Sequence, residues 1–322
     1  MFRNMEYIYA VYKTGSFSAA AKDLFVTQPC LSAMIKKTET QLGVPIFDRN
    51  AKPLRLTEYG VRYMDYLEKV RALEGELEQY LSDVRGLRTG QLSIGANNVF
   101  ASFVLPALMR KFKAQYPGVQ VQMVEGNISY LEDALMRGKL DLILDNCPLN
   151  TDAYLQHTLG TEQLLLAAHT GIHDADQLAP YCLSHSDILN GRHLQADTPA
   201  LPPNLFANAP FIVLRTGNDT RFRMDAIFQQ YGIRPDIQLE VDQLATAYNI
   251  ACTGLGLTLV SDTLLYQMPP HLDMRYYKLS SGGTTRSIYM YYKKSRYIPL
   301  AMQKFMDTTI AELSKGVTQL SG

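Results

Sequence analysis

Residues 15–57 decide the fold, through three segments: GSFSAAAKDL at 15–24, VTQPCLS at 26–32 and LGVPIFDR at 42–49. Gly15 is suited to ending one helix and Ser16 to capping the next. Thr27 is suited to capping a further helix, with Pro29 in its first turn, where a missing N–H is harmless. The stretch predicts a helix, a tight turn, a second helix and a basic loop. That is the layout of a winged helix-turn-helix, which places one helix in a DNA groove.

The second predicted helix has two distinct faces. Its apolar residues form one stripe (Leu31, Ile35, Leu42), and its polar residues form another at i, i+4, i+8 (Gln28, Ser32, Lys36). The polar stripe can face DNA, because Gln reads adenine, Ser bonds phosphate or base edges, and Lys neutralises phosphate. The alternative is a small helical bundle with a solvated polar face. The caps, the small residues 19–21 and the basic loop together favour DNA binding.

Residues 1–60 resemble the N-terminal domain of LysR-type transcriptional regulators, through 15–21, 26–32, 42–49 and 56–60. The resemblance implies that Thr27, Gln28, Pro29 and Ser32 meet DNA from the recognition helix, while Arg49, Lys52 and Arg55 serve the wing. The residues expected to contact DNA are Ser16, Thr27, Gln28, Pro29, Ser32, Lys36, Arg49, Lys52 and Arg55. Ala33, Thr38 and Lys52 depart from the residues usual in the family, which leaves the operator sequence open.

The charge distribution agrees with double-stranded DNA as a partner. The net charge of the 322 residues is zero, but residues 1–60 hold eight Lys or Arg against five Asp or Glu. Positive charge is therefore concentrated where DNA is expected to bind. A dimer or tetramer that presents several copies would strengthen this modest excess.

A long helix is expected over residues 61–88, after the DNA-binding domain at 1–60. Apolar residues recur there at alternating steps of four and three: Tyr59, Tyr63, Tyr66, Val70, Leu73, Leu77, Tyr80, Val84 and Leu87. This heptad seam predicts a homodimer through the linker helix. The alternative is an intramolecular core helix. The family resemblance agrees with the dimer, and a homotetramer and RNA polymerase are further expected partners.

From residue 89 onward strands and helices alternate, which predicts an α/β fold with parallel sheets. The expected strands include 92–96, 119–125, 140–144 and 163–168, with a helix over 100–116 and a capping box at Ser129-x-x-Glu132. Residues 169–209 are expected to be irregular. Residues 88–300 resemble the effector-binding domain of the same family. This implies two periplasmic-binding-protein-like α/β subdomains, at 89–162 with 266–322 and at 163–265, with crossovers near Thr161 and Leu265.

Short polar residues and glycines follow three of the predicted strands. Ligands of open α/β sheets bind at the carboxyl ends of strands, beside helix N-termini. The residues expected to bind an effector there are Asn97, Asn98, Gly126, Asn127, Ile128, Ser129, Thr216, Gly217, Asn218 and Asp242. Free N–H groups at helix starts suit a small molecule bearing a carboxylate or another anion. Asp219 is expected to cap a helix rather than face such a ligand. The alternative is that all three segments are ordinary helix caps.

Several other classes of function are disfavoured. No G-x-S-x-G, P-loop or H-E-x-x-H pattern occurs, so no enzyme is expected. The four cysteines are scattered, and Cys30 is expected to be a small packing residue. His169, His173 and His185 with Asp174 and Asp176 do not have convincing metal-site spacing, and neither a metal nor a cofactor is expected.

The remaining alternatives concern location and mode of action. The sequence shows no signal peptide and no stretch of ~18 apolar residues, so a cytoplasmic protein with no membrane partner is expected. A ligand-responsive transcription factor is favoured over a solute receptor or an architectural DNA-binding protein.

Overall fold

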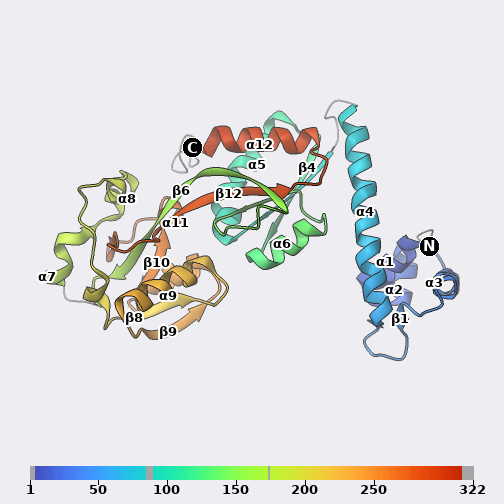
Figure 1. Ribbon diagram of the computed structural model, residues 1–322, viewed down its shortest axis with the longest axis horizontal. Coiled ribbons are helices and arrows are strands. Elements are labelled where there is room, and N and C mark those ends of the chain that lie inside the picture. Colours follow the sequence, from blue (N-terminus) through green and yellow to red (C-terminus); the bar gives the residue numbers. More distant parts are fainter. Residues whose placement is uncertain (1–3, 85–89, 173–174, 314–322) are drawn as a thin grey trace. The chain divides into compact units, whose positions relative to one another are not determined.

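The computed structural model describes residues 4–84, 90–172 and 175–313. The chain forms two compact units, Met1–Glu78 and Gln79–Gly322 (Figure 1). The elements of the first unit are α1 (Met5–Thr14), α2 (Phe17–Asp23), α3 (Gln28–Leu42), β1 (Phe47–Asp48), β2 (Arg55–Leu56) and the first part of α4 (Glu58–Val84). β1 and β2 pair in an antiparallel hairpin. The expected helix-turn-helix with a wing is confirmed.

The helix boundaries of the first unit follow from its caps. Gly15 ends α1 in the left-handed conformation (φ 63°). The Ser16 side chain accepts a hydrogen bond from the N–H of Ala19, and the Thr27 side chain accepts one from the N–H of Cys30. Both bonds satisfy N–H groups that the helix itself leaves without partners. The caps predicted from the sequence are therefore confirmed.

The core of the first unit receives the apolar stripe of α3. Leu31 and Ile35 are fully buried there, together with residues of α1, α2 and α4 such as Ile8, Ala20 and Leu67. Each buried Leu or Ile side chain among them contributes about 1.5–3 kcal/mol through removal from water. Thr38, a departure from the family pattern, is also buried, and its hydroxyl accepts a hydrogen bond from Asn4 Nδ2 at 3.3 Å.

Helix α4 does not present the predicted seam as one continuous face. Tyr63 is buried in the core of the first unit, so its expected place in the seam is wrong. Tyr59, Tyr66, Leu73, Leu77 and Tyr80 are each more than half exposed. The side chain of Val84 and residue Leu87 lie outside the described residues. What remains of the seam is an exposed apolar stripe, and the homodimer stays a prediction.

The second unit is built on an eight-stranded sheet (Figure 1). Its strands are β3 (Gly90–Ala96), β4 (Val119–Glu125), β5 (Leu142–Asp145), β6 (Tyr154–His169), β7 (Cys182–Leu183), β10 (Thr258–Ser261), β11 (Met274–Tyr277) and β12 (Thr285–Lys293). Strands β4, β3 and β5 run parallel, while β12 joins β5 and β6 antiparallel.

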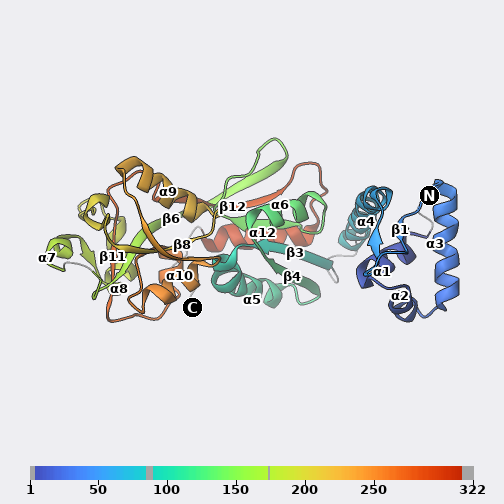
Figure 2. The ribbon, with the colours of Figure 1, turned by 90° about the horizontal axis from the view of Figure 1, so that it is seen from below.

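Helices cover both faces of the first subdomain. A π-helical turn (Phe100–Val104) leads into α5 (Leu105–Gln115), which shares one core with α12 (Leu300–Leu313). Helix α6 (Ile128–Met136) packs on the other face. Figure 2 shows α6 and α5 on opposite sides of β3 and β4.

The second subdomain also contains a separate two-stranded parallel sheet. The pair consists of β8 (Pro210–Leu214) and β9 (Asp236–Val241). The helices of this subdomain are α7 (Ala175–Leu178), α8 (His185–Leu189), α9 (Asp219–Tyr231), α10 (Leu244–Ala251) and α11 (Asp262–Leu265), with short 3-10 turns at Ala179–Tyr181, Arg192–Leu194 and Pro203–Phe206. Two apolar cores fill it, one on each face of β6.

Strand β6 belongs to both subdomains. Its residues 154–163 pair with β12, and its residues 164–169 pair with β10 or β11. The first crossover is thus inside β6, close to the expected Thr161. The second is not near Leu265, because β11 remains in the second subdomain with Met274 and Tyr276 in its core. The chain returns between Leu279 and Thr285.

Two local expectations are wrong. Asn127 caps α6, accepting a hydrogen bond from the N–H of Tyr130 at 2.9 Å, so no capping box begins at Ser129. The described part of 169–209 is not irregular: it holds short helices and a strand, and it buries His193 and Leu201 completely. His193 Nε2 lies 3.1 Å from Asp262 Oδ2, which anchors this segment to the start of α11.

No helix within residues 4–84, 90–172 and 175–313 combines the length and the apolar character that crossing a bilayer requires.

Gly60 should not tolerate a side chain. A Cβ there would lie 2.0 Å from the carbonyl oxygen of Ile46, a backbone atom that cannot move away freely. Gly60→Ala is expected to lower the free energy of unfolding of the first unit by about 2–3 kcal/mol. Thermal and urea unfolding of the purified protein measure this loss.

Gly75→Ala, in the same helix, is the matched control. None of the described atoms lies within 4 Å of its new Cβ, so the substitution should stabilise α4 by up to about 1 kcal/mol. Equal effects of the two substitutions would contradict the packing of Gly60 against Ile46.

Candidate functional site

The exposed face of α3 carries most of the residues expected to meet DNA. Thr27, Gln28, Pro29 and Lys36 are exposed, while the opposite face of the helix is buried. Because Gln28 and Pro29 form the first turn, the helix start presents amide, ring and N–H groups together. Cys30 is also exposed here, so the expectation of a packing residue is wrong.

Arg49 and Ser32 contact each other. Arg49 Nη1 donates to Ser32 Oγ at 3.1 Å, and Nη2 pairs with Glu39 Oε2 at 3.1 Å. Glu39 Oε1 in turn accepts hydrogen bonds from the N–H groups of Ile46 and Phe47. This network ties the segment after α3 back onto the helix. The Arg49 side chain is still 42% exposed, which leaves its guanidinium accessible to phosphate.

The remaining residues expected at DNA lie in two other places. Lys52 and Arg55 are exposed in and beside the β1–β2 hairpin, the wing of the predicted motif. Ser16 is half-buried, and its hydroxyl is engaged as the cap of α2. The structure therefore brings the α3 residues and Arg49 together, and places Ser16 on a different helix.

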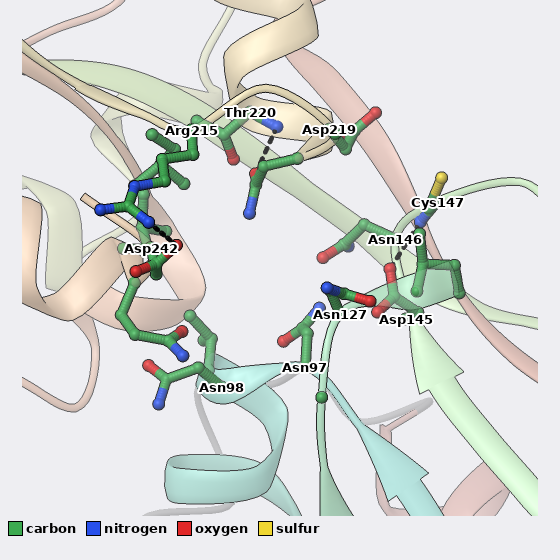
Figure 3. Close-up of a pocket in the computed structure, with 18 of the residues that line it drawn as sticks. Asn97, Asn98, Asn127, Asp145, Asn146, Cys147, Arg215, Asp219, Thr220 and Asp242 are labelled. Atoms are coloured by element: carbon green, nitrogen blue, oxygen red, sulfur yellow. Dashed lines mark hydrogen bonds and ion pairs between the residues drawn. The ribbon is translucent and has the colours of Figure 1, made fainter. Parts of the chain in front are cut away.

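The second unit contains a cavity of about 530 Å³ at the carboxyl ends of its strands (Figure 3). All ten residues expected to bind an effector line it: Asn97, Asn98, Gly126, Asn127, Ile128, Ser129, Thr216, Gly217, Asn218 and Asp242. They come from both subdomains, so the cavity is a cleft between them. Its volume suits a small molecule. Their binding of a ligand remains a prediction.

Three asparagines of the cleft cap helices through their oxygens. Asn97 Oδ1 accepts a hydrogen bond from the N–H of Phe100, Asn127 Oδ1 from Tyr130 and Asn218 Oδ1 from Thr220. Since an amide has one acceptor and one NH₂ group, each cap leaves its NH₂ donors available. The same asparagine side chains can therefore cap helices through their oxygens and bind a ligand through their NH₂ groups.

One hydrogen-bonded bridge crosses the cleft. Glu125 Oε1 accepts from Asn98 Nδ2 at 3.1 Å and from Gln243 Nε2 at 3.2 Å. Asn98 and Glu125 belong to the first subdomain and Gln243 to the second. Beside Gln243, Asp242 pairs with Arg215 at 3.6 Å, with both side chains about two-thirds exposed (Figure 3). The bridge therefore links the two subdomains across the cleft.

Asp145 is a cleft residue that the sequence analysis missed. It is 5% exposed at the end of β5, and its Oδ1 accepts a hydrogen bond from the N–H of Cys147 at 2.8 Å. Burial raises the pKa of Asp145 to about 6, although Cys147 N–H, Arg286 and Asn97 oppose the rise. Among the described residues, no cation lies within ion-pair distance of this carboxylate. Burial and the negative charge of Asp145 together raise the pKa of Cys147 to about 11.

Arg286, on β12, was also missed. Its guanidinium contacts Glu162 at 2.6 Å, Asp219 at 2.9 Å and the Thr220 hydroxyl at 3.0 Å. Burial opposes the charge of Arg286, but Glu162 and Asp219 hold its pKa above the ordinary value. The expectation that Asp219 caps a helix is wrong. Asn218 caps α9, and Asp219 pairs with Arg223 and Arg286 instead.

The charges of the cleft wall disfavour a simple anion. Four carboxylates line it (Glu125, Asp145, Asp219 and Asp242), against the two guanidinium groups of Arg215 and Arg286. A ligand with negative charge alone would be repelled by this excess. Within residues 4–84, 90–172 and 175–313, no cluster of three or more His, Cys, Asp or Glu side chains could hold a metal ion. His173 and Asp174 lie outside the described residues.

A winged helix-turn-helix and a ligand-sized cleft between two α/β subdomains define a DNA-binding regulator with a ligand-binding domain. Residues 2–61 match the family model of the bacterial regulatory helix-turn-helix protein, lysR family, and residues 85–314 match that of the LysR substrate binding domain. The chain belongs to the LysR family of transcriptional regulators. This family is not enzymatic.

Relatives with curated descriptions match the chain over nearly its whole length. It is 28% identical to the HTH-type transcriptional regulator YcgK of Bacillus subtilis over 315 residues, covering 97% of this chain and 94% of the relative. It is 24% identical to the HTH-type transcriptional activator CmpR of a Synechocystis species over 303 residues, covering 94% and 92%.

Solved structures share the fold at low identity. CbnR in complex with its target DNA superposes with a TM-score of 0.66 at 19% identity, covering 97% of this chain and 99% of that chain. Full-length BenM gives 0.56 at 20% identity, covering 98% and 97%.

Asp145→Asn is expected to stabilise the protein at neutral pH. Because the pKa is raised in the folded state, the unfolded carboxyl ionises first, and stability falls as pH rises from about 4 to about 6. Asn removes this loss, so the free energy of unfolding should increase by the order of 2 kcal/mol at about pH 7.5 and change little below about pH 4. Denaturant unfolding at both pH values measures it.

The comparison variant is Asp242→Asn, whose carboxylate lies in the same cleft but is largely exposed. Its stability should change by no more than about 0.5 kcal/mol at either pH. Destabilisation by Asp145→Asn at neutral pH would show that the buried charge is compensated in the folded state.

Proposed function

We propose that this regulator binds operator DNA sequence-specifically through α3 and the β1–β2 hairpin, and that a small molecule in the cleft controls the binding. The observation that carries the DNA-binding part is the two-faced α3, with Leu31 and Ile35 in the core and Gln28 and Lys36 exposed. Gln28 reads base edges, preferentially adenine, while Lys36 and Arg49 neutralise phosphates.

The regulator acts as a homodimer joined by α4. The support is the exposed apolar stripe of Tyr66, Leu73, Leu77 and Tyr80, since apolar residues at this spacing on a long helix are typical of a two-helix contact. A homotetramer and contact with RNA polymerase follow from the family resemblance and extend the same proposal.

The effector is small, polar and, in part, an anion such as a carboxylate. The NH₂ groups of Asn97, Asn127 and Asn218 and the starts of three helices offer donors to its oxygen atoms. Occupation of the cleft competes with the Glu125–Gln243 hydrogen bond and changes the angle between the subdomains. A coupling of about 1–3 kcal/mol to DNA binding is sufficient for regulation.

The base-reading role of Gln28 is testable with one substitution. Gln28→Ala should weaken binding to a selected operator by about 1–3 kcal/mol, because a bidentate base contact is lost, and leave binding to random duplex nearly unchanged. Fluorescence anisotropy with both duplexes at fixed salt measures the two affinities.

Lys36→Ala provides the comparison, because it removes a phosphate contact. It should weaken both duplexes about equally and reduce the salt dependence of binding by about one unit. If Gln28→Ala also weakens both duplexes equally, Gln28 does not read bases.

A further inference from the structure

Among the described residues, the carboxylate of Asp145 is the deeply buried acidic group of the cleft that has no cation within ion-pair distance. Asp219 contacts Arg223 at 2.7 Å and Arg286 at 2.9 Å, and Asp242 contacts Arg215. Among the described residues no arginine pairs with Glu125, and its side chain is exposed to water. Asp145 is 5% exposed and accepts a hydrogen bond from the N–H of Cys147. Buried charges are ordinarily paired.

We propose that the ligand of the cleft carries a primary ammonium group that pairs with Asp145, in addition to oxygen atoms that the asparagine amides bind. The ligand class is a small zwitterion of the amino-acid type. This assignment rests on the proposed effector function and names the chemistry of the effector.

A second acceptor lies beside Asp145. Asn146 is 3% exposed and lines the cavity, and its Nδ2 donates to the carbonyl oxygen of Ser287 at 3.2 Å. Its Oδ1 is therefore the acceptor left for the cavity. Figure 3 shows Asn146 and Asp145 at the same wall, with the Asn146 oxygen directed into the open space. A carboxylate and an amide oxygen at one wall suit the N–H groups of a compact ammonium.

The donors of the cleft are segregated from these acceptors by the helix caps. Each capping bond to Phe100, Tyr130 or Thr220 fixes the oxygen of its asparagine toward the backbone, so the NH₂ groups remain for the ligand. A carboxylate bound there and an ammonium at Asp145 would add no net charge to a wall that already has excess negative charge. A plain carboxylic acid would add negative charge and leave Asp145 without a cation.

The first test compares ligands that differ only in the amino group. The full-length protein is heated with each of the standard amino acids, with the corresponding desamino carboxylic acids and with the corresponding amines lacking the carboxylate. At least one amino acid should raise the unfolding temperature in a saturable way, with its desamino partner giving little or no shift. The proposal is overturned if desamino acids bind as tightly as the amino acids, or if no amino acid shifts the transition.

The second test identifies Asp145 as the partner of the ammonium. For the amino acid that binds best, calorimetry should show at least about 100-fold weaker binding to Asp145→Asn, because the ammonium loses its buried counter-ion. Asp145→Glu, which keeps the charge, should recover part of the affinity. Asp197→Asn, an exposed carboxylate outside the cleft, should leave the affinity unchanged. Unchanged binding to Asp145→Asn would overturn the proposal.

These results are distinguishable from failure of the proposed function. A ligand that binds without an amino group, and still alters DNA binding, removes the ammonium assignment and leaves the effector function intact. An amino acid that binds through Asp145 without altering DNA binding supports the ammonium assignment and contradicts the effector function.

Discussion

The buried guanidinium of Arg286 is the interaction on which the geometry of the cleft depends. It extends from β12 of the first subdomain, meets Glu162 on the shared strand β6, and reaches Asp219 and Thr220 at the start of α9 in the second subdomain. Removing one partner of such a buried group typically costs 3–5 kcal/mol, because a charge is left without compensation. The group therefore fixes the place where α9, with the Asn218 cap, enters the cleft.

The cleft combines this rigid junction with groups whose hydrogen bonding is incomplete. The asparagine caps satisfy helix N–H groups with their oxygens and keep their NH₂ groups for another partner. Asp145 carries a charge that burial makes unfavourable, and perturbed carboxylates in a cleft are enriched at functional sites. The opposing hydrogen bond from Gln243 to Glu125 is exposed to water. In the proposed function, the ligand replaces this exposed bridge while the Arg286 junction stays in place.

Local rules predicted much of this architecture. Helix caps at Ser16 and Thr27 and the alternating faces of α3 follow from spacing alone, and the structure confirms them. The rule that ligands bind at strand ends selected ten residues, and the structure places all of them around one cavity. The same rule applied to the strand ending at residue 145 would have found Asp145, which directly follows the apolar run 142–144.

Contacts between distant parts of the chain were not predictable in this way. Arg286 lies 124 residues from Glu162, and only the pairing of β12 with β6 brings the two together. The short strand β11 has little periodicity, so the second crossover was misplaced near Leu265. Tyr63 fits the heptad spacing of α4, but its side chain packs in the core of the helix-turn-helix. Tertiary packing there overrides the local pattern.

Selection of genomic DNA fragments by the purified protein, followed by affinity measurements against random duplex at one fixed salt concentration, tests the central claim most directly. A sequence-specific dimeric regulator should prefer sites with dyad symmetry by ~10³ or more. Equal affinity for all fragments, with a steep salt dependence, would contradict the account and indicate a protein that binds the DNA backbone without reading its sequence.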